Sequence, residues 1–371
     1  MKLLGVGLLG TGFMGRTHTY AYKNIAFYIS SIKAAPRLIA VYSRSSENAS
    51  RFAERYGFER AYSESFKPVI ELQDVDIVDN SLPNFLHYEP CRYALEKDKH
   101  VICEKPLATR LSEARELYEL WRKTGVKTAT VFNYRFLPAV KYMKEIIDSG
   151  GIGRPLQARL LYAHSGHVNP DRPWSWKEDF TSSGGGASAD LGIHAIDLAR
   201  YLVGEAIRVA AVERIFFQER KDRSGQTMKV TADDYSACLI EFSGGALGIV
   251  EATRVGTGYK NYLRVEVHGT EGALSWDLED LCRLRLFRVR GFDSKVGWEE
   301  ILVDMPWWPP RGHLGGWQAG HVLLIHSFLE SIVSDTPFEP SFYDGYQAQR
   351  ILEAIHLSSK ENRWVNLDSV K

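Results

Sequence analysis

The sequence predicts an α/β protein with an N-terminal doubly wound Rossmann domain and a C-terminal α+β domain built on an open, mainly antiparallel sheet. Short apolar runs alternate with segments of helical spacing over the first ~130 residues, and this alternation is typical of a parallel sheet. The turn Gly10-x-Gly12-x-x-Gly15 follows the first apolar run. After residue 136, strand-like runs follow one another across glycine turns with little helix between them, which indicates antiparallel pairing.

A length of 371 residues predicts two domains, because a single hydrophobic core stops growing well below that size. We expect a dinucleotide-binding Rossmann domain at 1–132 and a substrate-binding and oligomerisation domain at 133–371. Lys and Arg total 46, and Asp and Glu also total 46. Because there is no basic surplus, the charge balance argues against nucleic acid or an anionic membrane as a partner.

The cysteines and the apolar runs indicate the cellular compartment. The four cysteines lie far apart without CxxC spacing, which suits a reducing cytoplasm; they are Cys91, Cys103, Cys238 and Cys282. No run approaches the ~18 apolar residues of a membrane span, and the first apolar run lacks a signal-peptide layout. We therefore expect a cytoplasmic protein.

In the first domain, short apolar runs predict strands and 3.6-residue spacing predicts helices. Strands are expected at 3–9, 38–43, 75–81, 100–103 and 126–132. Helices are expected at 12–31, from the polar stretch that ends near Gly57, at 88–96 and at 111–124. Gly125 follows the last of these helices, where a C-terminal glycine is common.

In the second domain, we expect strands at 156–162, 207–218, 236–242, 246–252, 263–268 and 272–278. Helices are expected at 138–148, 190–203, 321–334 and 344–359. Tight turns at 243–245 and 269–272 contain glycine and join consecutive strands. These elements together predict an open sheet with a few helices.

The glycine turn near the N-terminus predicts a dinucleotide site because a strand precedes it and a helix follows it. Gly10 permits the tight turn, Gly12 lets the backbone approach a pyrophosphate, and Gly15 lets the helix pack on the strand. Phe13 and Met14 belong to the same turn. The N-terminus of the following helix would then face the phosphates, which predicts NAD or NADP as the cofactor.

The residues after the second strand bear on the choice between NAD and NADP. In folds of this kind an acidic residue at this point binds the ribose 2′-hydroxyl of NAD. This chain instead has Ser43 and Arg44, and the nearest acid is Glu47. Arg44 could pair with a 2′-phosphate, stack on adenine, or be an ordinary solvated arginine. The missing acid favours NADP but leaves the cofactor preference open.

Three side chains are candidates for proton transfer. Lys105 follows the strand at 100–103, at the carboxyl edge where ligands bind in these sheets. Asp190 and His194 are four residues apart after a glycine run, so a helix would place them on one face. The alternatives are a surface lysine and an ordinary helix pair. The sequence contains neither an HExxH nor a CxxC spacing, so it does not predict a metal site.

Three motifs resemble the signatures of the Gfo/Idh/MocA oxidoreductases: GTGFMG at 10–15, CEKPLA at 103–108 and DLGIHAID at 190–197. Further similarity lies at 82–87, 133–136 and 340–345. The segments 253–261 and 307–317 look most like members that oxidise anhydrosugars such as levoglucosan, or glycosides at carbon 3. The resemblance covers essentially the whole chain.

The resemblance implies that Lys105 lies near the nicotinamide and the substrate, and that Asp190 and His194 face the sugar hydroxyl. It also places Leu82, Pro83 and Asn84 along the nicotinamide ribose. The full set of expected cofactor contacts is Gly10, Gly12, Phe13, Met14, Gly15, Ser43, Arg44, Leu82, Pro83, Asn84, His87, Glu104 and Lys105.

Our hypothesis is an NAD(P)-dependent dehydrogenase acting on a secondary hydroxyl of a sugar, glycoside, anhydrosugar or inositol. His194 would be the general base, because an imidazole exchanges protons near neutral pH. Asp190 would hold that imidazole or bind a neighbouring hydroxyl, and Lys105 would polarise the reacting oxygen or share the proton transfer. Candidates to bind the sugar are Arg135, Trp174 and Trp176, each of which could equally be structural.

Two alternatives use the same residues differently. One is a redox-neutral glycoside-processing enzyme with tightly bound NAD(H), and the other is a dinucleotide sensor without catalysis. A sensor has no need for a lysine, an aspartate and a histidine together, which argues against it. We expect a homodimer or homotetramer formed through the C-terminal sheet, because an open sheet leaves a face to be covered.

Overall fold

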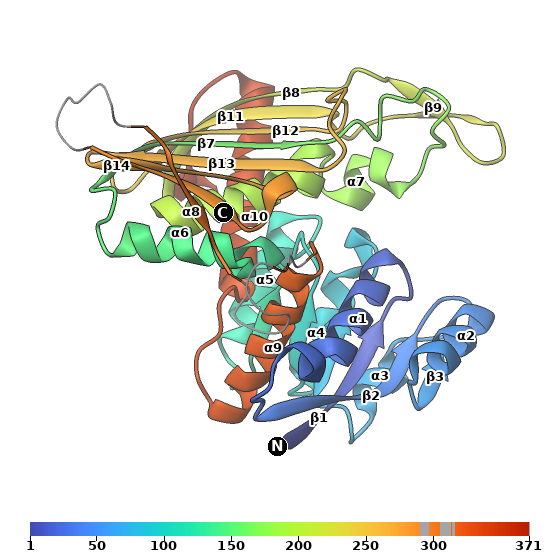
Figure 1. Cartoon of the computed structure of the whole chain (residues 1–371). Helices are drawn as coiled ribbons and strands as arrows, with labels where there is room; N and C mark the ends of the chain where they lie inside the picture. Colours follow the sequence, from blue (N-terminus) through green and yellow to red (C-terminus); the bar gives the residue numbers. More distant parts are fainter. Residues whose placement is uncertain (290–296, 305–312, 314–315, 371) are drawn as a thin grey trace. The chain divides into compact units, whose positions relative to one another are not determined.

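The structure, a computed structural model, describes residues 1–289, 297–304, 313 and 316–370 (Figure 1). These residues form two compact units, each with its own sheet. Of the described residues, unit 1 contains 1–136 and 316–347. Unit 2 contains 137–289, 297–304, 313 and 348–370. Within the described ranges, no helix is both long and apolar enough to cross a membrane.

Unit 1 is built on a six-stranded parallel sheet with the strand order β3-β2-β1-β4-β5-β6. The strands are β1 (Lys2–Leu9), β2 (Ala34–Tyr42), β3 (Arg60–Tyr62), β4 (Ile77–Asn80), β5 (His100–Cys103) and β6 (Thr128–Thr130). This is the strand order of dinucleotide-binding sheets, and ligands bind where it reverses, outside the ends of β1 and β4. The prediction of a Rossmann domain is confirmed.

The helices of unit 1 are α1 (Phe13–Tyr28), α2 (Ser46–Tyr56), α3 (Lys67–Glu71), α4 (Tyr88–Glu96), α5 (Leu111–Trp121) and α9 (Ala319–Ser334), with short turns η1 (Asn84–Leu86) and η2 (Asn133–Phe136). Helix α9 belongs to this unit by its contacts, although the sequence analysis expected it in the second domain. It packs here because its apolar residues, such as Val322 and Phe328, share one buried cluster with Ile25 of α1.

Unit 2 is built on a nine-stranded mixed sheet with the order β16-β15-β14-β13-β7-β12-β11-β8-β17. Its strands are β7 (Pro155–Ala163), β8 (Ala206–Arg214), β11 (Tyr235–Phe242), β12 (Leu247–Thr253), β13 (Tyr262–Gly269), β14 (Gly272–Asp277), β15 (Arg283–Arg288), β16 (Glu299–Leu302) and β17 (Val365–Asn366). Among the described strands of this sheet, only β7 and β12 pair in parallel. The predicted α+β domain with a mainly antiparallel sheet is confirmed.

The predicted strand at 207–218 ends early, at Arg214. The chain leaves the sheet there because the Asp234 carboxylate accepts hydrogen bonds from the backbone of Phe216 (2.8 Å) and Phe217 (3.1 Å). The chain then forms a separate hairpin of β9 (Glu219–Lys221) and β10 (Thr227–Lys229), which the sequence did not predict. Strands β3, β15, β16 and β17 were also not predicted.

The helices of unit 2 are α6 (Pro138–Asp148), α7 (Phe180–Ser183), α8 (Ile193–Val203) and most of α10 (Phe342–Glu361), with short turns η3 (Trp176–Glu178), η5 (Leu278–Asp280) and η6 (Leu367–Ser369) and the π-helix η4 (Ser188–Gly192). Alternate residues of β11, such as Cys238 and Ile240, are buried on one face of the sheet. Leu239, between them, is 48% exposed on the other face. The sheet therefore has one covered face and one open face.

Candidate active site

The glycine turn between β1 and α1 has the geometry of a phosphate-binding loop. Gly10 has a φ of 110°, which favours glycine. A Cβ atom on Gly15 would lie 2.1 Å from the Gly10 carbonyl oxygen, so only glycine allows this close packing. A Cβ on Gly12 would meet no atom within 4 Å, and no side chain caps α1. The start of the helix is therefore left open for an anion, as a dinucleotide pyrophosphate requires.

Three loops meet at the carboxyl edge of the unit 1 sheet. The Ser81 hydroxyl, after β4, donates to the carbonyl of Leu9 at the end of β1 (3.0 Å). The Glu104 backbone N–H, after β5, donates to the Asn80 carbonyl (3.0 Å). The glycine turn and Lys105 therefore lie on the same edge of one sheet, where the sequence placed them.

The loop that contains Leu82, Pro83 and Asn84 is fixed by its neighbours. The two ring nitrogens of His87 lie 2.7 Å from the Pro106 carbonyl oxygen and 2.8 Å from that of Leu82. His87 is fully buried, and burial lowers its pKa. The ring therefore ties the loop after β4 to the loop after β5. Direct contact of His87 with a cofactor stays a prediction.

The residues after β2 differ in exposure. Ser43 is buried, and its hydroxyl accepts a hydrogen bond from the Thr11 hydroxyl in the glycine turn (3.1 Å). Arg44 is exposed, and Ser45 caps α2 by accepting from the Asn48 N–H (3.3 Å). The side chain that could meet the adenosine ribose here is thus a cation rather than an acid.

A buried polar cluster that was not predicted from the sequence lies beside Lys105. His18 is fully buried, with Nδ1 2.8 Å from Asp79 and Nε2 3.1 Å from Glu104. Tyr22 donates to the same Asp79 carboxylate (2.8 Å). Burial alone would lower the pKa of His18, but the charges and hydrogen bonds of Asp79 and Glu104 raise it to about 10.

The fourth member of this cluster is His321 of α9. Burial and the nearby His18 lower the pKa of His321 to about 3, so it is neutral at pH 7. One ligand atom each from His18, Glu104 and His321 lies within 4.8 Å of the others, which is a spacing that metal ligands can have. Because both nitrogens of His18 already face carboxylates, we interpret the cluster as a hydrogen-bonded ion cluster instead.

Arg135, a predicted sugar contact, lies in η2 with 5% of its surface exposed. Its guanidinium donates to the Asp344 carboxylate (2.9 Å), which also accepts from the Ser341 N–H (2.9 Å). These bonds hold η2 and the start of α10 together. They favour the structural alternative for Arg135, and a sugar contact stays a prediction.

In unit 2, Asp190 lies in the π-helix η4 rather than in an ordinary α-helix, and His194 lies in the first turn of α8. Asp233 fixes the start of η4, because its carboxylate accepts from the backbone N–H (2.9 Å) and hydroxyl (2.7 Å) of Ser188. A Cβ atom on Gly186 would lie 1.7 Å from the Asp233 carbonyl oxygen. Gly186 is thus required for close packing within the protein. π-Helical turns are frequent at functional sites.

The Asp190 carboxylate faces a cation that was not predicted from the sequence. Lys177 Nζ donates to Asp190 Oδ2 at 3.1 Å, and both side chains keep part of their surface open to solvent. His194 is 7% exposed, and its ring centroid lies 6.0 Å from that of Tyr162. Unit 2 therefore contains the Lys177–Asp190 pair and, four residues after Asp190, the nearly buried imidazole of His194.

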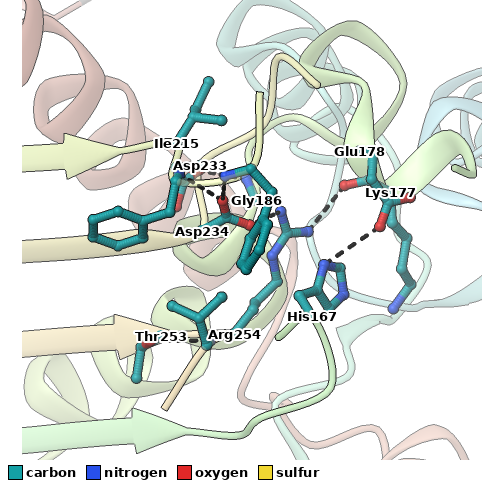
Figure 2. A network of polar contacts seen from close by, with 12 residues as sticks. His167, Lys177, Glu178, Gly186, Ile215, Asp233, Asp234, Thr253 and Arg254 are labelled. Atoms are coloured by element: carbon teal, nitrogen blue, oxygen red, sulfur yellow. Dashed lines mark hydrogen bonds and ion pairs between the residues drawn. The ribbon is translucent and has the colours of Figure 1, made fainter. Parts of the chain in front are cut away.

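Lys177 is itself held by a buried network (Figure 2). The Arg254 guanidinium, 1% exposed, donates to the Lys177 carbonyl (3.0 Å) and lies 3.6 Å from Asp234. The fully buried Glu178 accepts from the backbone and hydroxyl of Ser175 in a capping box. These contacts fix the backbone that carries Lys177.

His167 completes this network as a neutral ring. Burial and the charges of Arg254 and Arg172 lower the pKa of His167 to about 2. Its approach to Glu178 (3.3 Å) is therefore a contact between a neutral ring and a carboxylate, not an ion pair. Burial also lowers the pKa of the neighbouring His164. Neither ring is expected to carry a charge at pH 7.

The two predicted sugar-stacking tryptophans have different surroundings. Trp174 is anchored to the β9–β10 hairpin, because its indole N–H donates to the Lys229 carbonyl (3.1 Å) and its backbone N–H to that of Lys221 (2.7 Å). The Lys177 ammonium lies 5.7 Å from the Trp176 ring centroid. Trp176 thus adjoins the Lys177–Asp190 pair, and a sugar contact by either tryptophan stays a prediction.

The sequence signals for the missed residues are recognisable afterwards. Asp79 and Asn80 are polar residues in a strand that reads as buried, which signals a polar network.

Of the tryptophan-rich stretch 307–317, only His313, Gly316 and Trp317 fall in the described ranges. Trp317 stacks on Phe13 of the glycine turn, with ring centroids 5.7 Å apart.

Comparison with known proteins agrees with this geometry. A sequence profile described as "oxidoreductase family, NAD-binding Rossmann fold" matches residues 4–132, and one for the GFO/IDH/MocA C-terminal domain matches 140–275. Levoglucosan dehydrogenase of Pseudarthrobacter phenanthrenivorans is 34% identical over the full length of both chains. The chain belongs to the Gfo/Idh/MocA family of oxidoreductases. The family resemblance seen in the three motifs is therefore confirmed.

A second relative is named for a different substrate. Myo-inositol 2-dehydrogenase of Thermotoga maritima is 29% identical, over 98% of this chain and 99% of its own. Among solved structures, levoglucosan dehydrogenase in complex with NADH and levoglucosan has a TM-score of 0.95 and 34% identity, with 98% of this chain and 99% of the other covered.

Proposed function

We propose that this protein is an NAD-dependent dehydrogenase that oxidises a secondary hydroxyl group of a carbohydrate, such as a sugar, glycoside, anhydrosugar or inositol. The observation that carries the proposal lies in unit 1, where an open glycine turn and Lys105 share the carboxyl edge of one Rossmann sheet. Full-length similarity to levoglucosan dehydrogenase supports a carbohydrate substrate. We propose NAD rather than NADP as the cofactor because the structure of levoglucosan dehydrogenase contains NADH.

The glycine turn and the start of α1 would hold the dinucleotide phosphates, and the loop 82–84 would lie along its nicotinamide ribose. When bound, NAD supplies the acceptor for the hydride that leaves the carbinol carbon. His194 takes the hydroxyl proton as the general base. Lys105 stabilises the oxygen as it becomes a carbonyl. Asp190 binds a neighbouring hydroxyl, and Lys177 holds the Asp190 carboxylate in place.

The open face of the unit 2 sheet supports a homodimer or homotetramer. Exposed apolar side chains lie on adjacent strands of this face, and they are Val212, Leu239, Leu247 and Ile249. An apolar patch on a sheet is usually covered by a second copy of the chain. All four cysteines are buried, and Cys91, Cys103 and Cys238 form no disulfide, which supports a reducing compartment such as the cytoplasm.

The test is absorbance at 340 nm with purified protein, NAD or NADP, and a panel that contains levoglucosan, inositols, glucose and glucosides. We expect a continuous rise with NAD and at least one member of the panel. Absence of a rise, with NAD(H) already bound to the purified protein, would replace the proposal with the redox-neutral alternative. Absence of both a rise and cofactor binding would refute the proposal altogether.

A further inference from the structure

The buried cluster of His18, Asp79, Glu104 and His321 has no role in the proposed proton transfer, and yet it is costly to bury. Asp79 is fully buried and Glu104 is 5% exposed. Two carboxylates in a protein interior repel each other unless a cation lies between them. His18 occupies that position, with one ring nitrogen on each carboxylate.

The hydrogen bonds require the charged form of His18. Nδ1 lies 2.8 and 3.0 Å from the two oxygens of Asp79, and Nε2 lies 3.1 Å from Oε1 of Glu104. Ionised carboxylates only accept hydrogen bonds, so both ring nitrogens must donate, which only an imidazolium can do. The neutral His321 of α9 lies against the ring, with ring centroids 5.8 Å apart, and Tyr22 of the same helix as His18 donates to the Asp79 carboxylate.

Glu104 links His18 to Lys105, because its carboxylate contacts both residues. Its Oε1 atom faces His18, while its Oε2 atom accepts from the Lys105 backbone N–H at 3.0 Å. The backbone N–H of Glu104 is held by the Asn80 carbonyl (3.0 Å). Both carboxylate oxygens therefore have a fixed partner. Together these bonds determine where the Lys105 side chain leaves the sheet edge.

We propose that His18, itself held by Asp79, is a positioning residue that fixes the Glu104 carboxylate and thereby places Lys105 for its part in the reaction. This rests on the proposed function, because it requires that Lys105 acts on the substrate. Misplacement of a catalytic group by ~1 Å can cost ~100-fold in rate, so buried support of this kind matters for turnover. Glu104 also places a negative charge next to the lysine that acts.

The experiment compares His18→Asn and Glu104→Gln with the wild type, using NAD and the panel sugar that gives the highest wild-type rate. We expect kcat to fall by about 10- to 100-fold, the range seen when residues that orient an active group are removed. In His18→Asn the KM for NAD should change by less than about 3-fold, because the glycine turn is untouched. Glu104 is itself an expected cofactor contact, so Glu104→Gln is compared by kcat alone.

The pH profile separates positioning from simple loss of structure. In the His18→Asn protein no cation lies between Asp79 and Glu104, so the pKa of one of these carboxyl groups rises. We therefore expect kcat of this variant to decline toward acidic pH in a range where the wild type is flat. Glu104→Gln removes one of the two charges and should not show this decline.

Tyr20→Phe is the matched control. Tyr20 lies on the same helix, α1, and its hydroxyl shares a hydrogen bond with that of Tyr28 (2.9 Å) rather than with Asp79 or Glu104. Loss of this hydroxyl should leave kcat and its pH profile as in the wild type. If His18→Asn does not fold, Glu104→Gln carries the test alone, because glutamine has the same size as glutamate and can still accept from the Lys105 N–H.

Unchanged kcat and an unchanged pH profile in either folded variant would overturn the positioning role. Lys105→Met distinguishes this failure from failure of the proposed function. If Lys105→Met abolishes turnover while Glu104→Gln does not reduce it, only the positioning role is wrong. If Lys105→Met also leaves turnover intact, the proposed function of Lys105 is wrong and the positioning role falls with it.

Discussion

The ammonium group of Lys177 donates a hydrogen bond to the carboxylate of Asp190 at 3.1 Å, although the two residues belong to different elements, η3 and the π-helix η4. Both side chains remain partly open to solvent. A buried arginine, Arg254, holds the Lys177 backbone in place (3.0 Å). A rigid network thus fixes the position of one partly exposed lysine, which supports the proposal that the pair binds the substrate.

An ion pair that is this exposed contributes little to folding, typically ~0.2–1 kcal/mol. Its effect on a bound sugar is larger, because a hydrogen bond to a charged group is worth ~1.5–3 kcal/mol. We therefore expect Lys177→Met to lower kcat/KM for the sugar by about 10-fold or more, while stability changes by less than ~1 kcal/mol. Steady-state kinetics and urea unfolding measure the two quantities.

Lys229→Met provides the control for this change. Lys229 is an exposed lysine of β10 in the same unit. Both kcat/KM and stability should stay at wild-type values. If Lys177→Met behaves like Lys229→Met in the sugar assay, Lys177 has no part in substrate binding.

The lysine–aspartate pair also marks the limit of what the sequence predicted. Asp190 and His194 were identified from their spacing and their motif, because both lie within one continuous stretch of chain. Lys177 was missed because its relation to Asp190 depends on how η3 folds against η4, which Arg254 and Glu178 determine. Contacts between segments of irregular chain leave no periodicity to read.

The regular parts of the fold show the opposite behaviour. The parallel sheet and helix α6 were predicted closely, since apolar periodicity is local and strong there. The parallel pairing of β7 with β12 was not predicted, because it depends on the chain crossing over through α7, η4 and α8. The His18 cluster was missed for a related reason: its members come from four separate elements.

The glycine turn is expected to bind the dinucleotide and also to let α1 pack closely on β1. Adding one methyl group at Gly12 or at Gly15 tests these two roles separately. Gly12→Ala meets no atom of the protein within 4 Å, so the free energy of unfolding should change by less than ~0.5 kcal/mol. We expect it to raise the Kd for NAD by about 10-fold or more, because the methyl group occupies the space needed by the pyrophosphate. Isothermal titration with NAD measures this directly.

Gly15→Ala should behave differently, because its Cβ would lie 2.1 Å from the Gly10 carbonyl oxygen. The backbone must shift, and we expect a loss of ~1–3 kcal/mol of stability in addition to weaker NAD binding. Gly125→Ala is the control, since its Cβ also meets nothing and it lies outside the turn. Equal effects of Gly12→Ala and Gly125→Ala on the Kd for NAD would mean that the turn does not hold the dinucleotide.

Arg44 offers a test of cofactor preference. It is exposed and follows the strand end where a 2′-phosphate would lie, while Ser43 is already bonded to Thr11. We expect Arg44→Ala to lower kcat/KM for NADP by about 10-fold, the loss of one charge-assisted contact, and that for NAD by less than about 3-fold. Equal losses with both cofactors would assign Arg44 to the adenine ring instead of the phosphate.

The His356–Glu213 pair of unit 2 predicts how stability depends on pH. His356 Nδ1 lies 2.9 Å from the Glu213 carboxylate. Burial lowers the pKa of His356, but the hydrogen bond and charge of Glu213, with Asp233 and Glu353, raise it to about 8. Burial also raises the pKa of Glu213, which His356 opposes. A carboxyl group beside an imidazolium loses its proton first, so the change above pH 6 belongs to His356.

A histidine whose pKa rises on folding stabilises the protein fully below its unfolded pKa, near 6.5, and the stabilisation is lost as the pH rises through about 8. The shift corresponds to about 2 kcal/mol. We expect the free energy of unfolding to fall by about that amount more in the wild type than in His356→Gln between pH 6 and pH 9. His18 titrates equally in both proteins, so it cancels in the difference. Parallel pH dependences in urea unfolding would mean that folding does not raise the pKa of His356.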